Sequence, residues 1–258
     1  MEGADLMFMR MVQVRVKSLE LNTLRTLYAE RIIPTLEKVQ GCRYAGLMQS
    51  AHRPEECISL TLWDTQADAG AYEKSGVFER LLEETRPYLS ESSESRIQIS
   101  RDLTLEYVPI PDEPVVSSFP IAVQSDSMAT DRKEHDGIWL RIVSLRVRQG
   151  KMEEFKRSYL EQVIPTLRTV KGCRYIYLTE NAEKPNEVIS VTSWDSKEDA
   201  EHYQKSGLFD RLLQSQKDLL SELYQWKRDR DQEHAGSVST SEDLSMENYG
   251  VLIGKDFK

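Results

Sequence analysis

Alternating and helically spaced apolar positions follow one another along this chain in an order that occurs twice. Between Met9 and Lys17, Val12, Val14 and Val16 fall on alternate positions, a spacing typical of a half-buried strand. The segment that begins at residue 140 keeps this alternation. After each strand, apolar residues three and four positions apart predict an amphipathic helix. They are Leu21, Leu24, Tyr28, Ile32, Leu36 and Val39, then Met152, Phe155, Tyr159, Val163, Leu167 and Val170.

The recurrence is a duplication of sequence as well as of pattern. Residues 9–91 align with residues 140–222 without a gap, at an offset of about 131 and with roughly 45% identity. For example, YAERIIPTLEKVQGCRY (28–44) returns as YLEQVIPTLRTVKGCRY (159–175). Two copies are too few for a solenoid, so the repeat predicts two related domains that associate within one chain.

The remaining elements of each repeat follow from shorter signals. CRYAGLMQS and ECISLTLWD, with their second-copy equivalents, predict a hairpin, and a second helix begins at Thr65-x-x-Asp68 or Ser196-x-x-Asp199, each a hydroxyl N-cap. Breaks are expected at three points in each repeat. They are the bends at Pro34 and Pro165, the left-handed turns at Gly41 and Gly172, and the interruptions at Ser75-Gly76 and Ser206-Gly207.

A last strand should complete each sheet. The similar strings DLTLE (102–106) and DLSME (243–247) are the candidates, and their offset of about 141 indicates an insertion near 227–241 in the second copy. Residues 109–136 are rich in Pro, Ser and Asp and are predicted to be a linker. The expected domains are therefore 7–108 and 137–258.

Strand, helix, strand, strand, helix, strand is the split βαβ order, an antiparallel sheet with both helices on one face. The first strand also carries Met9 and Met11 on the other face, matched by Leu140 and Ile142. That apolar face needs a cover, which the other copy can supply. The predicted fold class is α+β, with two ferredoxin-like repeats whose sheets pack into an intramolecular dimeric α+β barrel.

Composition limits the partners. A net charge of −9 and a pI of about 5.2 oppose binding to nucleic acid, and no apolar segment is long enough to cross a membrane. The first residues do not have the pattern of a signal peptide, so a cytoplasmic location is expected. The three cysteines, Cys42, Cys57 and Cys173, are expected to be reduced and unreactive.

Several motifs resemble the antibiotic-biosynthesis-monooxygenase family of dimeric α+β barrels. They are the Ile-Pro of the first helix, the Gly-Cys-Arg before the second strand, the Trp-Asp that ends the third and the Lys-Ser-Gly-x-Phe of the second helix. Members usually build the barrel from two chains, so this chain resembles a fused version. The resemblance implies oxygenation of a small quinol or polyketide-like phenol without metal, flavin or any other cofactor, because the substrate itself reduces dioxygen.

The resemblance also places a pocket between helices and sheet, which needs apolar walls, a proton acceptor and donors for a phenolate. The candidate catalytic residues are Trp63, Tyr72, Trp194 and Tyr203, and the candidate substrate-binding residues are Ser59, Thr61, Ser190 and Thr192. Each also has a structural interpretation, since large aromatic side chains dominate ordinary cores. Tyr28 and Tyr159 are expected in the core. Arg15 and Arg146 are expected in ion pairs near the space between the sheets.

One branch of the family degrades haem with an Asn in the first strand and a Trp and a His on the second helix. The equivalent residues here are Val12, Tyr72 and Leu82, which disfavours haem chemistry. The four histidines are too far apart in sequence to predict a metal site.

A second function remains open, a non-catalytic module that binds a small molecule or a protein on the same fused barrel. Fusion allows the halves to diverge, and the differences Leu62 against Ser193, Gly46 against Tyr177 and Ala45 against Ile176 indicate that the two pockets have diverged. One half can therefore have lost activity. Further association of fused barrels is also possible.

Overall fold

A computed structural model describes residues 7–99, 105–111, 115–124, 138–181, 186–221 and 244–257. The insertion predicted near 227–241 lies outside these ranges, and so does the Lys184-Pro185 turn. Within them the predicted order of strand, helix, strand, strand and helix is confirmed in both repeats, and the closing strand is confirmed in the second.

In the first repeat the elements are β1 (Phe8–Arg15), α1 (Leu21–Leu27), α2 (Ile33–Leu36), β2 (Cys42–Ser50), β3 (Glu56–Trp63), α3 (Gln66–Lys74) and α4 (Val77–Thr85). In the second they are β7 (Trp139–Arg146), α5 (Met152–Ser158), α6 (Ile164–Arg168), β8 (Cys173–Glu180), β9 (Glu187–Trp194), α7 (Lys197–Lys205) and α8 (Leu208–Ser215). Strands β2 and β3 pair antiparallel, as do β8 and β9, so both predicted hairpins are confirmed.

The predicted helix interruptions have local causes. Pro34 and Pro165 cannot donate a backbone hydrogen bond, and the chain accommodates each with a π-helical turn just before it, at Tyr28–Ile32 and Tyr159–Val163. Gly76 and Gly207 have φ of 72° and 68°, the left-handed conformation that separates α3 from α4 and α7 from α8. The hydroxyls of Thr65 and Ser196 cap α3 and α7.

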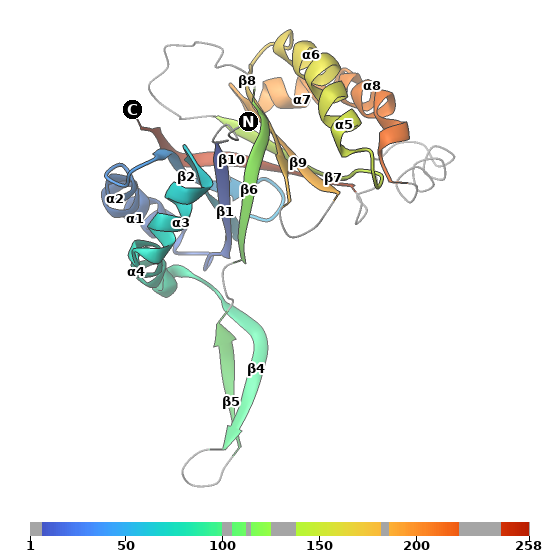
Figure 1. The fold of residues 1–258 in the computed structure, drawn as a ribbon. Coiled ribbons are helices and arrows are strands. Elements are labelled where there is room, and N and C mark those ends of the chain that lie inside the picture. Colours follow the sequence, from blue (N-terminus) through green and yellow to red (C-terminus); the bar gives the residue numbers. More distant parts are fainter. Residues whose placement is uncertain are drawn as a thin grey trace.

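The sheets of the two repeats form one closed barrel in the order β1-β3-β2-β10-β7-β9-β8-β6. Strand β10 (Leu244–Asp256) pairs first with β7 of its own repeat and then with β2 of the other. Strand β6 (Val115–Gln124) pairs with β1 on one side and with β8 on the other. The helices of each repeat cover their own part of the barrel wall from outside (Figure 1).

The structure corrects the closing strand of the first repeat. Leu105 and Glu106 of the DLTLE string belong to β5 (Leu105–Pro111), which pairs with β4 (Glu91–Ile99) in a separate hairpin that projects from the barrel (Figure 1). Strand β6, within the segment predicted as a linker, takes that place instead. Its Pro and Ser content favoured the linker interpretation, but VVSSFPIAVQ also has the β-branched residues that suit a strand.

Three apolar cores hold this arrangement together. Two lie between helices and sheet, one in each repeat. The third lies inside the barrel, where Met9, Met11, Leu140 and Ile142 are all buried. The prediction that each copy covers the open sheet face of the other is therefore confirmed.

Candidate functional site

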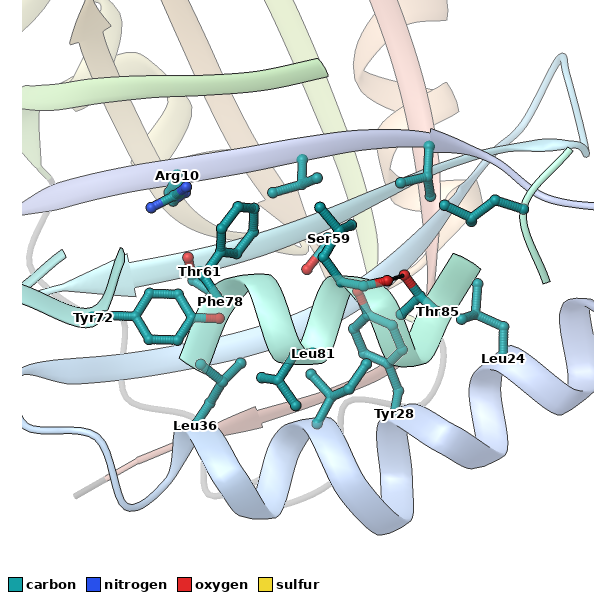
Figure 2. A pocket seen from close by; sticks show the side chains of 15 residues that line it. Arg10, Leu24, Tyr28, Leu36, Ser59, Thr61, Tyr72, Phe78, Leu81 and Thr85 are labelled. Carbon is teal, nitrogen blue, oxygen red and sulfur yellow. Dashed lines mark hydrogen bonds between the residues drawn. The ribbon is translucent and has the colours of Figure 1, made fainter. Parts of the chain in front are cut away.

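Each repeat contains a small cavity between its helices and its sheet. The first is about 50 Å³ and the second about 60 Å³. The side chains around the first are Arg10, Val12, Val14, Leu24, Tyr28, Ile32, Leu36, Ser59, Thr61, Tyr72, Phe78, Leu81, Leu82, Thr85 and Leu89. Figure 2 shows Arg10, Thr61, Tyr72 and Phe78 at one end, and Tyr28 and Thr85 farther along.

The two cavities share their polar side chains almost without change. Arg141, Tyr159, Ser190, Thr192 and Tyr203 line the second cavity at the positions of Arg10, Tyr28, Ser59, Thr61 and Tyr72 in the first. The one polar difference is Gln216 in place of Thr85. Whatever the cavities do, both halves retain the groups for it.

A buried arginine is the strongest charge in each cavity. Arg10 is 3% exposed and Arg141 is 1% exposed. Arg10 contacts Glu73 through Nη1 at 3.3 Å, and its guanidinium carbon lies 4.2 Å from the centre of the Phe78 ring. The same atom of Arg141 lies 4.2 Å from the centre of the Phe209 ring. Cation–π contacts of this kind partly replace lost hydration.

Neither guanidinium is fully satisfied. Among the described residues, Nε of Arg10 and Nε of Arg141 have no hydrogen-bond partner although both atoms are buried. Burying a donor without a hydrogen-bond partner costs free energy, so such a donor commonly binds a ligand or water. Burial lowers the pKa of Arg141 to about 10, against the opposing influence of Tyr203 and Asp210, so its guanidinium stays protonated at neutral pH. An anion is the ligand that each arginine would favour.

The tyrosines next to the arginines are hydrogen-bond donors. Burial raises the pKa of Tyr72 well above its ordinary value despite the opposing charge of Arg10, and Tyr203 is shifted the same way near Arg141. Both phenols therefore keep their protons at neutral pH. They cannot act as general bases there, but they can donate to an anionic oxygen. Figure 2 shows the Tyr72 hydroxyl directed into the cavity beside Thr61.

The tryptophans lie behind these residues. Trp63 and Trp194 are 0% exposed, and neither lines a cavity. Each indole N–H donates to the threonine two residues earlier, at 2.9 Å to Thr61 and 3.0 Å to Thr192. Trp63 also stacks on Tyr72, with ring centres 5.0 Å apart. Since each threonine oxygen accepts from an indole, its own O–H can point into the cavity.

A second polar pair lies deeper in each half. The Tyr159 hydroxyl is 2.7 Å from Oγ of Ser190. In the first repeat burial raises the pKa of Tyr28 to about 12, and a hydrogen bond with Ser59 acts against that shift. As expected, Tyr28 and Tyr159 are buried on the helix stripe. The hydroxyls of Ser59 and Ser190 therefore already form one hydrogen bond each, with a buried tyrosine.

The structure brings six of the eight predicted site residues to the cavities and leaves the two tryptophans behind them. Sequence reasoning missed Arg10 and Arg141, although both share the alternation of the helix-facing valines. It singled out Arg15 and Arg146 instead. These form the expected ion pairs, with Glu56 at 3.8 Å and Glu187 at 3.0 Å, but about half of each side chain is exposed. They lie at strand ends, where solvent hydrates them.

The expected proton acceptor is absent from the cavity walls. No Asp, Glu or His is among the described residues that line either cavity. In the part of the chain that the structure describes, no three His, Cys, Asp or Glu side chains cluster as metal ligands.

A third cavity, of about 320 Å³, lies inside the barrel between the two repeats. Its walls combine apolar residues of both halves with three tyrosines and Ser193. The lining residues are Met7, Met9, Arg43, Tyr44, Met48, Leu60, Leu62, Asp64, Ile138, Leu140, Tyr175, Tyr177, Val191, Ser193, Val251, Asp256 and Phe257. Arg43 and Asp256 are exposed whereas Met48 and Leu140 are buried, so the cavity opens to solvent near the former pair.

Two of the three divergent pairs of positions belong to this third cavity. Leu62 and Ser193 both line it, and so does Tyr177, the counterpart of Gly46. The expectation that these differences separate the two helix-to-sheet pockets is therefore wrong for these two pairs, whereas Ala45 and Ile176 do pack in the helix-to-sheet cores of their repeats. Side-chain direction explains the difference, because alternate strand residues point either to the helices or into the barrel.

The buried thiols supply a direct test of the core. Burial raises the pKa of Cys42, Cys57 and Cys173 to about 12, so almost no thiolate exists at pH 8. We expect no thiol of the folded protein to react with Ellman's reagent at pH 8, and all three to react in denaturant. Rapid labelling of the folded protein would contradict this burial.

Fold and cavities together define a fused pseudo-dimeric α+β barrel. A family model, antibiotic biosynthesis monooxygenase, matches residues 7–84 and 140–214. The chain therefore belongs to that family and carries two copies of its domain. No curated protein matches the chain by sequence.

Solved structures share the whole barrel. A predicted monooxygenase from Lactobacillus acidophilus NCFM matches with a TM-score of 0.66 and 8% identity, over 97% of this chain and 96% of that chain. One from Fusobacterium nucleatum has a TM-score of 0.65 and 10% identity, over 98% and 96%. An anthrone oxidase-like protein has a TM-score of 0.56 and 13% identity, over 98% and 94%. At these identities the likeness establishes the fold.

None of the helices within the described ranges is both long and apolar enough to span a membrane.

Proposed function

We propose that the protein is a monooxygenase that oxidises a small phenol or quinol in its two helix-to-sheet cavities without a cofactor. Family membership and fold support oxygenase chemistry. The observation that carries the proposal is the buried arginine of each cavity, with an unpaired Nε–H beside a protonated tyrosine and a threonine hydroxyl. Together they form a site for a phenolate oxygen.

The donors act on the electronics of the substrate. An arginine, a tyrosine and a threonine around one oxygen favour the phenolate, which transfers an electron to dioxygen far more readily than the neutral phenol. Superoxide and the phenoxyl radical then join at a ring carbon to give a peroxide. Loss of water leaves a quinone, so one oxygen atom enters the substrate and the other leaves as water.

The closed cavities are too small for this substrate. An engineered cavity of about 150 Å³ holds benzene, whereas these are about 50 and 60 Å³. Substrate entry therefore requires an element to move. Helices α4 and α8 are suited to it, because each is short and follows the left-handed Gly76 or Gly207. Leu81 and Leu82 of α4 would open the cavity if that helix swung outward.

Oxygen consumption tests the reaction. With metal-free and flavin-free protein and a panel of quinols and naphthols, we expect one quinone formed per dioxygen consumed. The Tyr72→Phe and Tyr203→Phe variants should each lower turnover, and the double variant should lower it most. Turnover no faster than autoxidation with every substrate, or a double variant as active as the parent protein, would refute the proposal.

The pH dependence of kcat/KM tests whether the reaction proceeds without a base from the protein. Because no carboxylate or histidine is among the described cavity residues, kcat/KM should rise with pH and level off near the pKa of the phenol used. Two phenols of different acidity should give two different midpoints. A midpoint that stays constant between them would point to a protein base instead.

The second candidate is a non-catalytic module that binds a small molecule. The 320 Å³ cavity inside the barrel favours it, since that space has the size of ordinary ligand pockets without any movement. Saturable binding without product formation would support this function.

A further inference from the structure

We infer that the barrel interior is a separate binding site for one neutral, planar, mostly apolar molecule with a hydroxyl or carbonyl group at one end. The site is the 320 Å³ cavity between the two repeats. It does not depend on oxygenation in the outer cavities, because it lies on the opposite face of the sheet.

The size of the cavity argues for an occupant. Barrel interiors of this kind are normally filled by their own side chains. Here the open volume is about twice that of an engineered cavity that holds benzene, enough for two or three fused rings. A space of that size left empty forgoes packing contacts on every side.

The two halves of the wall differ in chemistry. The first repeat contributes the thioether and aliphatic side chains of Met7, Met9, Met48, Leu60 and Leu62, together with the Tyr44 hydroxyl and the ion pair of Arg43 with Asp64. The second contributes the hydroxyls of Tyr175, Tyr177 and Ser193 along with aliphatic groups. Methionine sulfur is polarisable and packs well on aromatic rings. The second repeat thus contributes three of the hydroxyl groups in the wall and the first repeat contributes one, so one end of the cavity is richer in hydrogen-bonding groups.

Sequence differences between the copies create this polarity. In a symmetric dimer the wall residues would occur as identical pairs about the axis. Ser193 replaces Leu62, and Tyr177 replaces Gly46, where the missing side chain lets the Tyr44 ring lie against the strand. The outer cavities keep their polar residues while the inner one has become asymmetric. An asymmetric cavity suits a ligand with two different ends.

Geometry indicates a flat ligand. The rings of Tyr175 and Tyr177 lie within 10° of parallel, with centres 6.2 Å apart, and both residues line the cavity. Ser193 Oγ accepts from the Tyr175 backbone N–H at 3.2 Å, so its own O–H can donate to a ligand. An aromatic system can pack on the tyrosines while its oxygen meets Ser193.

Charge at the opening disfavours anions. Arg43 is paired with Asp64 at 2.5 Å, and Asp256 adds a further carboxylate. Burial and the nearby Asp256 raise the pKa of Tyr177, so the interior phenol is neutral. The charged residues that line the cavity are Arg43, Asp64 and Asp256, a formal charge of −1, which disfavours a carboxylate or phosphate ligand over a neutral one.

The number of sites separates this proposal from the proposed function. We would titrate the full chain with N-phenyl-1-naphthylamine, a neutral dye that fluoresces in apolar surroundings, and measure stoichiometry by calorimetry. One site per chain is expected, whereas binding in the outer cavities would give two. Naphthalene and 2-naphthol would then compete with the dye to test the hydrogen-bonding end.

Two substitutions locate the site. Leu140→Trp fills the barrel cavity and should weaken dye binding at least tenfold. Ser193→Leu places the residue already present at the equivalent position 62, and should weaken 2-naphthol roughly 3- to 10-fold more than naphthalene. The Arg10→Met, Arg141→Met double variant alters only the outer cavities and should leave the dye affinity unchanged.

Circular dichroism and thermal melting would show that each variant folds. Two equivalent sites per chain, no saturable dye binding, or an affinity unchanged in both barrel variants would each overturn the inference. If the parent protein binds the dye as expected but oxygenates no substrate, only the proposed function would be refuted.

Discussion

Replacing Arg10 and Arg141 together with methionine is expected to lower oxygenation by a factor of roughly 10² to 10³ without lowering stability. Activity should fall because the phenolate loses the only cation among the described residues that line each cavity. Stability should hold because each guanidinium is buried with an unpaired Nε, and apolar replacements of buried charges are often neutral or stabilising by about 1–4 kcal/mol.

The two single variants show how much each repeat contributes to turnover. If both cavities work equally, Arg10→Met and Arg141→Met should each leave about half of the turnover, and a strong bias would identify one active half. The matched control is Arg15→Met with Arg146→Met, which removes exposed ion pairs on the same strands and should change neither property appreciably. Steady-state oxygen uptake and urea unfolding measure the two quantities. A double variant that unfolds more easily and keeps its activity would assign the arginines a structural role.

Trp63→Ala is expected to reduce the free energy of unfolding by about 3–5 kcal/mol, a large part of the stability of an ordinary domain. The indole is fully buried, stacks on Tyr72 and donates to Thr61, so its loss leaves a cavity and loosens two groups of the site. Trp194→Ala should have a similar effect, because Trp194 stacks on Tyr203 at 4.9 Å and donates to Thr192. Chemical denaturation measures both.

The Trp63→Phe variant tests whether the indole has a structural role or takes part in the reaction. Phenylalanine preserves much of the stack but removes the N–H donor to Thr61, so the loss of stability should be smaller than for alanine. If the indole only positions Thr61 and Tyr72, the combined variant Trp63→Phe, Trp194→Phe should fold and retain measurable turnover. Complete loss of turnover in a folded variant would instead place the tryptophans in the reaction.

The fold could be predicted well from the sequence because each element occurs in both copies, so its pattern could be checked twice. The hairpins, the caps at Thr65 and Ser196 and the breaks at Gly76 and Gly207 all have strong local causes. The first closing strand failed for the opposite reason. Its partner β1 lies about 100 residues earlier, and such long-range pairing leaves only a weak local signal.

The site was partly predictable. Four of the six predicted residues that reach the cavities, Ser59, Thr61, Ser190 and Thr192, share a strand face by alternation. Alternation along β1 likewise placed Arg10 with Val12 and Val14. A charged residue in an otherwise apolar row was the available signal. The inner cavity left a different signal, the copy differences Leu62 against Ser193 and Gly46 against Tyr177, but their place inside the barrel depends on how strands distant in sequence face one another.

The order in which the strands are made has a consequence for synthesis. Strand β2 pairs with β10, which follows it in the chain by about 200 residues. At roughly 5–20 residues per second, a ribosome needs on the order of 10 to 40 seconds to make the intervening chain. During that interval β2 has an unpaired edge, the kind of surface that joins neighbouring chains. Chaperones are therefore expected to bind the first repeat while the chain is still being synthesised. Where many ribosomes translate one mRNA, neighbouring nascent chains could exchange their β10 strands.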